Sequence, residues 1–188
     1  MPNNRPNNKF SDVEADLLVA VQDLAPQWAA PASRQLSHFG EHGLGWYALA
    51  GLGMAANMRG GAGPGEAERR RVGRRQWAAV GVAAFTAHAT SVVVKRIVRR
   101  QRPIDPRITV GVATPSRLSF PSSHSTSTTA FLTGLARTTG SPLPLLGAPV
   151  MMVSRMVLGV HYPTDTLVGA AIGAATAGAV TEIERRTR

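Results

Sequence analysis

The segment SRMVLGVHYPTD, residues 154–165, places side chains that can do chemistry in an apolar setting. Arg155 stands inside an apolar run, where a charge without a partner costs several kcal/mol. Its planar guanidinium can bind two phosphate oxygens at once. His161 and Asp165 are four residues apart, so the carboxylate can orient one ring nitrogen and leave the other basic. The segment indicates either an anion site with a nucleophilic imidazole or a structural Arg155–Asp165 ion pair beside an inert histidine.

A second segment, SFPSSHSTSTTAF at residues 119–131, has the features of an anion-binding helix start. Pro121, Ser122 and Ser123 precede His124 and a run that is compatible with a helix. The free N–H groups and the positive dipole end of a helix attract anions, and the two serine hydroxyls can donate further hydrogen bonds. An ordinary serine-rich N-cap with a histidine at the membrane interface is the alternative.

A third segment, VVVKRIVRRQRP at residues 92–103, ends an apolar run with basic residues. Lys95, Arg99 and Arg102 follow one helical face at positions i, i+4 and i+7, and Pro103 is expected to end the helix. Basic residues at a helix end commonly anchor it at the membrane interface. This segment alone therefore does not distinguish an anchor from an anion site.

Taken in order, the three segments read K-x6-RP, PS-x-H and SR-x5-H-x3-D. This pattern resembles the type 2 phosphatidic acid phosphatase superfamily, which also includes bacterial acid phosphatases and vanadium haloperoxidases. The resemblance covers Lys95 to Asp165 by motif. One position departs from it, because the family's middle motif is usually PSGH and Ser123 stands here in place of the glycine. The added side chain can narrow the pocket, although the backbone N–H of Ser123 can still face phosphate.

The resemblance implies a phosphate-binding set. Lys95, Arg102 and Arg155 would surround the phosphate, helped by Ser122 and by the backbone of Ser123. Such an arrangement stabilises the charge of the transition state electrostatically. Three cations already supply the charge neutralisation that a metal would provide, and the motifs contain no carboxylate cluster for Mg²⁺. The resemblance therefore implies neither a metal nor another cofactor.

The resemblance also implies three catalytic residues. His161 would attack phosphorus in line and form a phosphohistidine, while Asp165 orients its ring. His124 would protonate the leaving oxygen and later activate water.

Composition limits the kind of protein that can carry this site. The chain has 188 residues, enough for one domain with its own core, and no repeat divides it. It has no cysteine, which excludes disulfides, thiolate metal sites and cysteine nucleophiles. A net charge of +10 suits an anionic partner, whether nucleic acid, lipid headgroups or a phosphorylated substrate.

Apolar runs between the basic residues predict an all-α fold. We expect a polytopic membrane bundle of about five transmembrane helices, although each run is short for a full span of roughly 20 residues. A soluble bundle with alanine-rich buried helices is the alternative. The uncharged runs are Gly43–Met58, Trp77–Val94, Ser125–Ala136, Thr138–Ser154 and Thr166–Thr181.

The remaining segments are expected to be attachments and connectors. Residues 1–10 are polar and predicted to be disordered, and residues 11–188 are predicted to form a single membrane domain. Ser11 and Glu14 match a capping box that starts an amphipathic helix over residues 11–31, lying along the membrane surface or along the bundle. Residues 59–76 are predicted to be a flexible basic loop.

The predicted function is hydrolysis of a lipid-linked phosphate at the cell membrane, with no role for nucleic acid. The resemblance implies the candidate substrates, which are phosphatidate, phosphatidylglycerophosphate, polyprenyl phosphate or diphosphate, and decaprenylphosphoryl phosphoribose of a cell envelope. A soluble acid phosphatase or haloperoxidase and a non-catalytic lipid-binding membrane protein are the alternatives. Apart from the three phosphate ligands, basic residues are slightly more numerous on the side of residues 59–76, which predicts that this side is cytoplasmic and the site faces outward.

Overall fold

The computed structural model describes residues 9–59 and 63–188, and these residues form seven α-helices and no strand. This confirms the predicted all-α fold. The predicted disorder of residues 1–10 falls mostly outside the described residues, because the first helix begins at Lys9. The helices are α1 (Lys9–Leu24), α2 (Ala29–Phe39), α3 (Leu44–Ala56), α4 (Pro64–Val98), α5 (Ser123–Thr139), α6 (Gly147–Val157) and α7 (Pro163–Arg186), with short 3-10 turns at Glu41–Gly43 and Leu143–Leu146.

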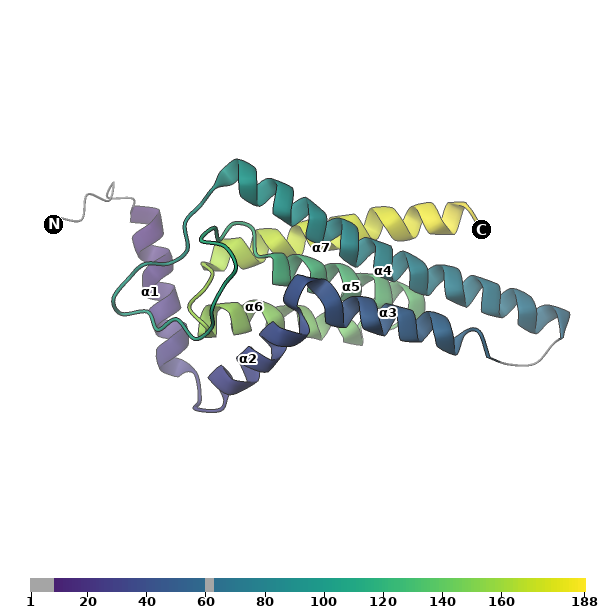
Figure 1. The fold of residues 1–188 in the computed structure, drawn as a ribbon, viewed down its shortest axis with the longest axis horizontal. Helices are drawn as coiled ribbons and strands as arrows, with labels where there is room; N and C mark the ends of the chain where they lie inside the picture. Colours follow the sequence, from purple (N-terminus) through teal and green to yellow (C-terminus); the bar gives the residue numbers. More distant parts are fainter. Residues whose placement is uncertain (1–8, 60–62) are drawn as a thin grey trace.

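The bundle is elongated, with α3 to α7 running along its long axis and α1 lying across one end (Figure 1). Helix α5 is central and packs against α4, α6 and α7. Its inward faces carry small side chains such as Thr126 and Ala130, which are fully buried and let the neighbouring helices approach closely. Helix α1 and the C-terminal end of α7 lie at opposite ends of the bundle, and the long connection from α4 to α5 lies at the same end as α1 (Figure 1).

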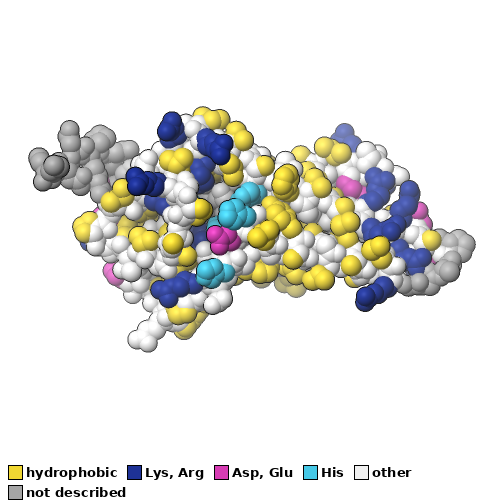
Figure 2. Space-filling model, viewed as in Figure 1, with side chains coloured by type: hydrophobic (Ala, Val, Ile, Leu, Met, Phe, Trp, Pro, Cys, Tyr) yellow, Lys and Arg dark blue, Asp and Glu magenta, His cyan; other side chains and the backbone are white. Residues whose placement is uncertain are grey.

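Helices α4 and α7 are long and apolar enough to cross a membrane, and Leu143–Val157 forms a shorter apolar segment. Large apolar side chains on these helices face outward, including Phe85 (62% exposed) and Leu167 (57% exposed). Lysine and arginine side chains gather toward the two ends of the molecule, with a largely hydrophobic band between them (Figure 2). This distribution favours a bilayer around the bundle over the soluble alternative, because lipid removes the outward apolar surface from water.

The five predicted apolar runs correspond to α3, α4, α5, α6 with its preceding turn, and α7. The structure nevertheless corrects the predicted limits of α4. Residues 64–76 were expected to belong to a loop but form the first turns of this helix. The helix then ends at Val98, where Arg99 adopts a left-handed conformation with φ of 55°. Arg102 therefore lies in the following loop and does not share a helical face with Lys95.

The predicted amphipathic helix over residues 11–31 is two helices, because the chain turns between Leu24 and Ala29. Ser11 lies inside α1, so the predicted capping box is wrong. Glu14 is instead buried against the bundle.

The two faces of α1 differ in their surroundings. Leu18 is fully buried, whereas Val13, Leu17 and Leu24 are exposed. The helix therefore packs on the bundle by one face and presents an apolar stripe on the other, which is typical of a helix at a membrane surface.

Two glycines allow α7 to pack closely on α5. A methyl group at Gly173 would collide with the carbonyl oxygen of Thr126 and lie 2.9 Å from the nitrogen of Ala130. A methyl group at Gly169 would lie 2.7 Å from the carbonyl oxygen of Ser122. The small-xxx-small spacing of these residues thus brings the helix backbones into contact.

We expect Gly173→Ala to destabilise the protein by about 1–3 kcal/mol, because the added methyl group meets backbone that cannot yield without separating the helices. Gly178→Ala on the same helix is the matched control, since the nearest atom to its methyl group is the tip of Arg137 at 3.9 Å. Thermal unfolding in detergent measures both variants. Equal midpoints for the two would contradict the proposed close packing.

Candidate active site

Six of the eight predicted site residues line one cavity of about 520 Å³. It lies where the end of α4, the start of α5 and the connection from α6 to α7 meet. The predicted residues in its lining are Lys95, Arg102, Ser123, His124, Arg155 and His161. The remaining two, Ser122 and Asp165, are fully buried and are absent from its lining. Segments far apart in sequence thus bring the three motifs to one place.

His161 is 3% exposed, and its two ring nitrogens have different surroundings. Nε2 lies 3.2 Å from Nη1 of Arg102. A guanidinium can only donate, so Nε2 must accept and the proton of the neutral ring must be on Nδ1. Nδ1 faces Oδ2 of Asp165 across 3.6 Å. This arrangement leaves the basic lone pair of His161 on the side of the cations, where a phosphate would bind.

Burial, followed by the positive charges of Arg102, Lys95 and Arg155, lowers the pKa of His161 well below its ordinary value. The imidazole is therefore neutral around pH 7 and its lone pair is available for attack. An imidazolium would repel the same three cations. An anion bound between these cations would reduce this repulsion and would stabilise the positively charged ring that forms when His161 attacks.

Lys95 donates from Nζ to three backbone carbonyls, those of Leu118 at 3.2 Å, Ser119 at 3.2 Å and Pro121 at 2.9 Å. These residues immediately precede α5. The ammonium thus holds the segment that carries the middle motif while keeping its charge beside the cavity.

Arg102 joins two further segments through backbone carbonyls. Nε donates to Ser116 at 2.8 Å and Nη1 to Val160 at 2.6 Å. Burial lowers the pKa of Arg102 to about 10, so the side chain remains charged at neutral pH. Arg102 therefore reaches the cavity beside Lys95 from a loop, although a shared helical face was expected to place it there.

Arg155 is 2% exposed and is held by α2. Nη1 donates to the hydroxyl of Ser37 at 3.1 Å and Nη2 to the carbonyl of Ser33 at 3.4 Å. Nε is buried without a hydrogen-bond partner among the described residues. Asp165 pairs with Arg100 and not with Arg155, so the alternative of a structural Arg155–Asp165 ion pair is wrong.

The start of α5 fits the predicted anion site only in part. Ser122 caps the helix, its hydroxyl accepting from the N–H of Ser125 at 3.4 Å, and its own N–H donates to the carbonyl of Asp165 at 2.9 Å. His124 lies at the cavity with Nε2 3.0 Å from the carbonyl of Ser37. The hydroxyl of Ser123 accepts from Ser91 at 2.8 Å. The side chain that replaces the family's glycine therefore has a place against α4.

Sequence reasoning missed a buried charge network behind His161. Arg100 donates to Asp165 at 3.0 Å and to the hydroxyl of Thr164 at 2.7 Å, and it pairs with Glu14 of α1. Its guanidinium lies 4.1 Å from the ring centre of Tyr162. Glu14 in turn accepts from the N–H of Thr164 at 3.0 Å. The only sequence signal for this network was the position of Glu14 within an amphipathic helix. The local pattern S-x-x-E assigned Glu14 to a helix cap instead.

The arrangement combines a neutral imidazole, an adjacent carboxylate, a second histidine and three cations. It can bind a phosphate dianion, attack phosphorus with His161 and exchange a proton through His124. Within residues 9–59 and 63–188, no three His, Asp or Glu side chains gather in a way that could hold a metal ion. The three cations that line this cavity are suited to binding an anion.

Known proteins share both sequence and fold with this chain. The PAP2 superfamily model matches residues 76–188, which include every predicted site residue. A decaprenylphosphoryl-5-phosphoribose phosphatase of Mycolicibacterium smegmatis is 55% identical over 158 residues, covering 83% of this chain and 81% of that protein. The protein of the same description from Mycobacterium tuberculosis is 49% identical over 172 residues, covering 90% and 89%.

In fold, the chain is similar to the crystal structure of a transmembrane PAP2-type phosphatidylglycerolphosphate phosphatase from Bacillus subtilis. The TM-score is 0.69 at 19% identity, and the match covers 97% of this chain and 89% of that one.

The buried network predicts that α1 contributes to turnover. We expect Glu14→Gln to lower kcat about tenfold while KM changes little, because Arg100 loses a charged partner and holds Asp165 less firmly behind His161. Hydrolysis of p-nitrophenyl phosphate in detergent measures both constants.

Asp16→Asn is the matched control for Glu14→Gln. Asp16 lies on the same helix and pairs with Arg107 in an exposed ion pair, so it should change neither constant by more than about twofold. Similar kinetics for the two variants would show that the network has no part in positioning.

Proposed function

The chain belongs to the PAP2 superfamily and is a membrane lipid phosphatase, and from this premise we propose that it removes the 5-phosphate of decaprenylphosphoryl-5-phosphoribose. The substrate is supported by the two mycobacterial relatives, which match this chain over more than four fifths of its length. The 5-phosphate is a monoester, which suits a site that holds a dianion among three cations. The observation that carries the chemistry is neutral His161 facing Arg102 inside that cationic cavity.

In the proposed first step, Lys95, Arg102 and Arg155 bind the phosphate oxygens, and the phosphate replaces Nε2 of His161 as an acceptor for Arg102. Nε2 attacks phosphorus as the bond to the ribose oxygen breaks. His124, which enters this step as the imidazolium, gives one of its two ring protons to that leaving oxygen and becomes neutral. Asp165 stabilises the positive ring, whose Nδ1–H faces its carboxylate.

In the second step, His124 accepts a proton from water, and the resulting hydroxide attacks the phosphohistidine. Inorganic phosphate leaves and His161 returns to its neutral form. The cations stabilise the charge on phosphorus in both steps. All three catalytic positions of the motifs carry the expected residues, which favours an enzyme over a non-catalytic lipid-binding protein.

We also propose a multi-pass topology for the single domain of residues 11–188, with five spans in α3 to α7 and the active site facing outward. Arg75, three turns into α4, donates to the carbonyl of Thr187 at 2.8 Å, so the basic residues of both segments lie at one end of the bundle. A basic end opposite the site favours a cytoplasmic location for that end.

Gly63 tests this orientation, because it is exposed at the basic end and the chain contains no cysteine. A cysteine introduced by Gly63→Cys should react with an impermeant maleimide only after cells are permeabilised. Arg117→Cys, at the exposed loop of the opposite end, should react in intact cells. The reverse labelling pattern would establish an inward-facing site.

His161→Ala should abolish turnover of every phosphate ester, by at least about a thousandfold, because the nucleophile is lost. Lipid phosphate and p-nitrophenyl phosphate should be affected alike. Substantial residual turnover of either substrate would rule out His161 as the nucleophile.

His124→Ala should distinguish the two substrates. A sugar alkoxide needs a proton to leave, whereas p-nitrophenolate is stable without one, so the lipid substrate should lose about 100-fold more in phosphoenzyme formation. Because water attack still needs a base, the variant should accumulate an acid-labile phosphoenzyme in single-turnover experiments. Equal losses with no trapped intermediate would assign His124 another role.

A further inference from the structure

The cavity extends well beyond the residues that bind phosphate. Its volume of about 520 Å³ lies in the range of pockets that enclose a small organic ligand. Outside the three motifs, the lining comes from α2 and the corner between α2 and α3, from α4, and from the connection between α4 and α5. Apolar side chains such as Val92 and Val112 contribute to it, but one part is polar. It includes Glu41, His42, His88 and Arg96.

The rings of His42 and His88 lie close together, with their centres 6.2 Å apart. Each ring can form hydrogen bonds with a ligand. Nδ1 of His88 is buried and has no hydrogen-bond partner among the described residues. His88 precedes Lys95 by seven residues on α4, which is two helical turns or about 10 Å along the axis. This separation leaves room for a sugar-sized group between the phosphate cations and the pair.

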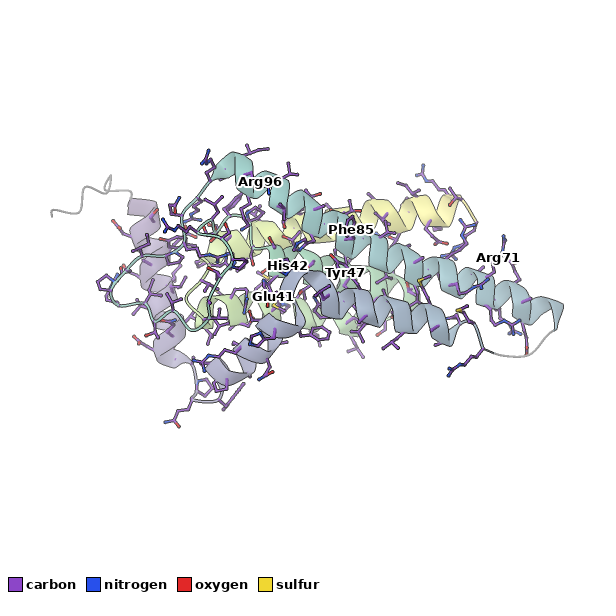
Figure 3. The ribbon with its side chains drawn as sticks, in the orientation of Figure 1. Glu41, His42, Tyr47, Arg71, Phe85 and Arg96 are labelled. Atoms are coloured by element: carbon purple, nitrogen blue, oxygen red, sulfur yellow. The ribbon has the colours of Figure 1, made fainter. Side chains whose placement is uncertain are left out.

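Glu41 places a carboxylate in the lining of a cavity whose other charged side chains are all cations. It lies beside His42 at the corner between α2 and α3 (Figure 3), and an acidic side chain lies among histidines on this face of the molecule (Figure 2). A carboxylate repels phosphate and can only accept hydrogen bonds. The group that it best fits is therefore a hydroxylated one, which supplies donors.

Arg96 provides a fourth cation near the end of α4 (Figure 3). It is exposed, it lines the cavity beside Lys95, and no described residue forms an ion pair with it. Its charge is therefore available to a second anionic group of the substrate, outside the buried site of cleavage.

We propose that these residues form a leaving-group subsite for a lipid-linked phosphosugar. Glu41, His42 and His88 hydrogen-bond the sugar hydroxyls, and Arg96 binds the phosphodiester that joins the sugar to the lipid. The inference rests on the proposed function, and it deepens that function by naming the groups that select a phosphoribose lipid over phosphatidate, which lacks both a sugar and a second phosphate.

The test compares Arg96→Gln with Arg99→Gln, in which an exposed arginine at the same helix end lies outside the cavity lining. Decaprenylphosphoryl-5-phosphoribose, phosphatidate and p-nitrophenyl phosphate are assayed in the same detergent micelles. Arg96→Gln should raise KM for the phosphoribose lipid about tenfold, as expected for loss of a charged hydrogen bond. The other two substrates should change less than about twofold, and Arg99→Gln should leave all three unchanged within that limit.

Glu41→Gln and His88→Ala should lower kcat/KM for the phosphoribose lipid about five- to tenfold through KM, without a matching loss on p-nitrophenyl phosphate. His42→Gly is a third variant, because glycine adopts the left-handed conformation of His42 at φ 51° without strain. Parallel losses on all substrates, or no loss on any, would overturn the subsite. A wild-type enzyme that cleaves phosphatidate but not the phosphoribose lipid would instead refute the proposed function itself.

Discussion

The structure depends on burying positive charge around one neutral imidazole. A cation removed from water needs acceptors, and here backbone carbonyls provide most of them. Lys95 binds three carbonyls and Arg102 binds two, all from the loop before α5 or from the connection before α7. The same contacts that satisfy the cations fold these segments over the end of the bundle. The site is therefore assembled before substrate arrives, which is the condition for electrostatic stabilisation without reorganisation.

The relative position of the motifs depends on the contact between α5 and α7. Gly169 brings α7 against the backbone at Ser122, and the N–H of Ser122 donates to the carbonyl of Asp165 at 2.9 Å. The first turn of α7 and the cap of α5 are thus held against each other. Because Asp165 lies behind His161 and Ser122 precedes His124, this backbone contact sets the distance between the two histidines.

Local patterns predicted the parts of this protein that depend on short stretches of sequence. The motifs identified the eight candidate site residues, and uncharged runs located the apolar helices. Long-range partners could not be predicted this way: Glu14 and Arg100 are 86 positions apart, and Ser37 and Arg155 are 118 apart. The pattern S-x-x-E at Ser11 is compatible with a cap, but it contains no information about Arg100, a partly buried arginine that pairs with the glutamate.

The two N-terminal helices support the site from one end of the bundle. Ser37 of α2 contacts Arg155 through its hydroxyl and His124 through its carbonyl. One residue thus fixes the position of a proposed phosphate-binding cation relative to the proposed general acid. Helix α1 carries Glu14 on its buried face and Leu17 on its exposed face. A helix that lies across the end of the bundle in this way would rest its apolar stripe at the lipid interface while its opposite face supports the site. The cavity would then lie at the depth of the lipid headgroups, where a phosphate can reach the cations while its lipid tail remains in the bilayer.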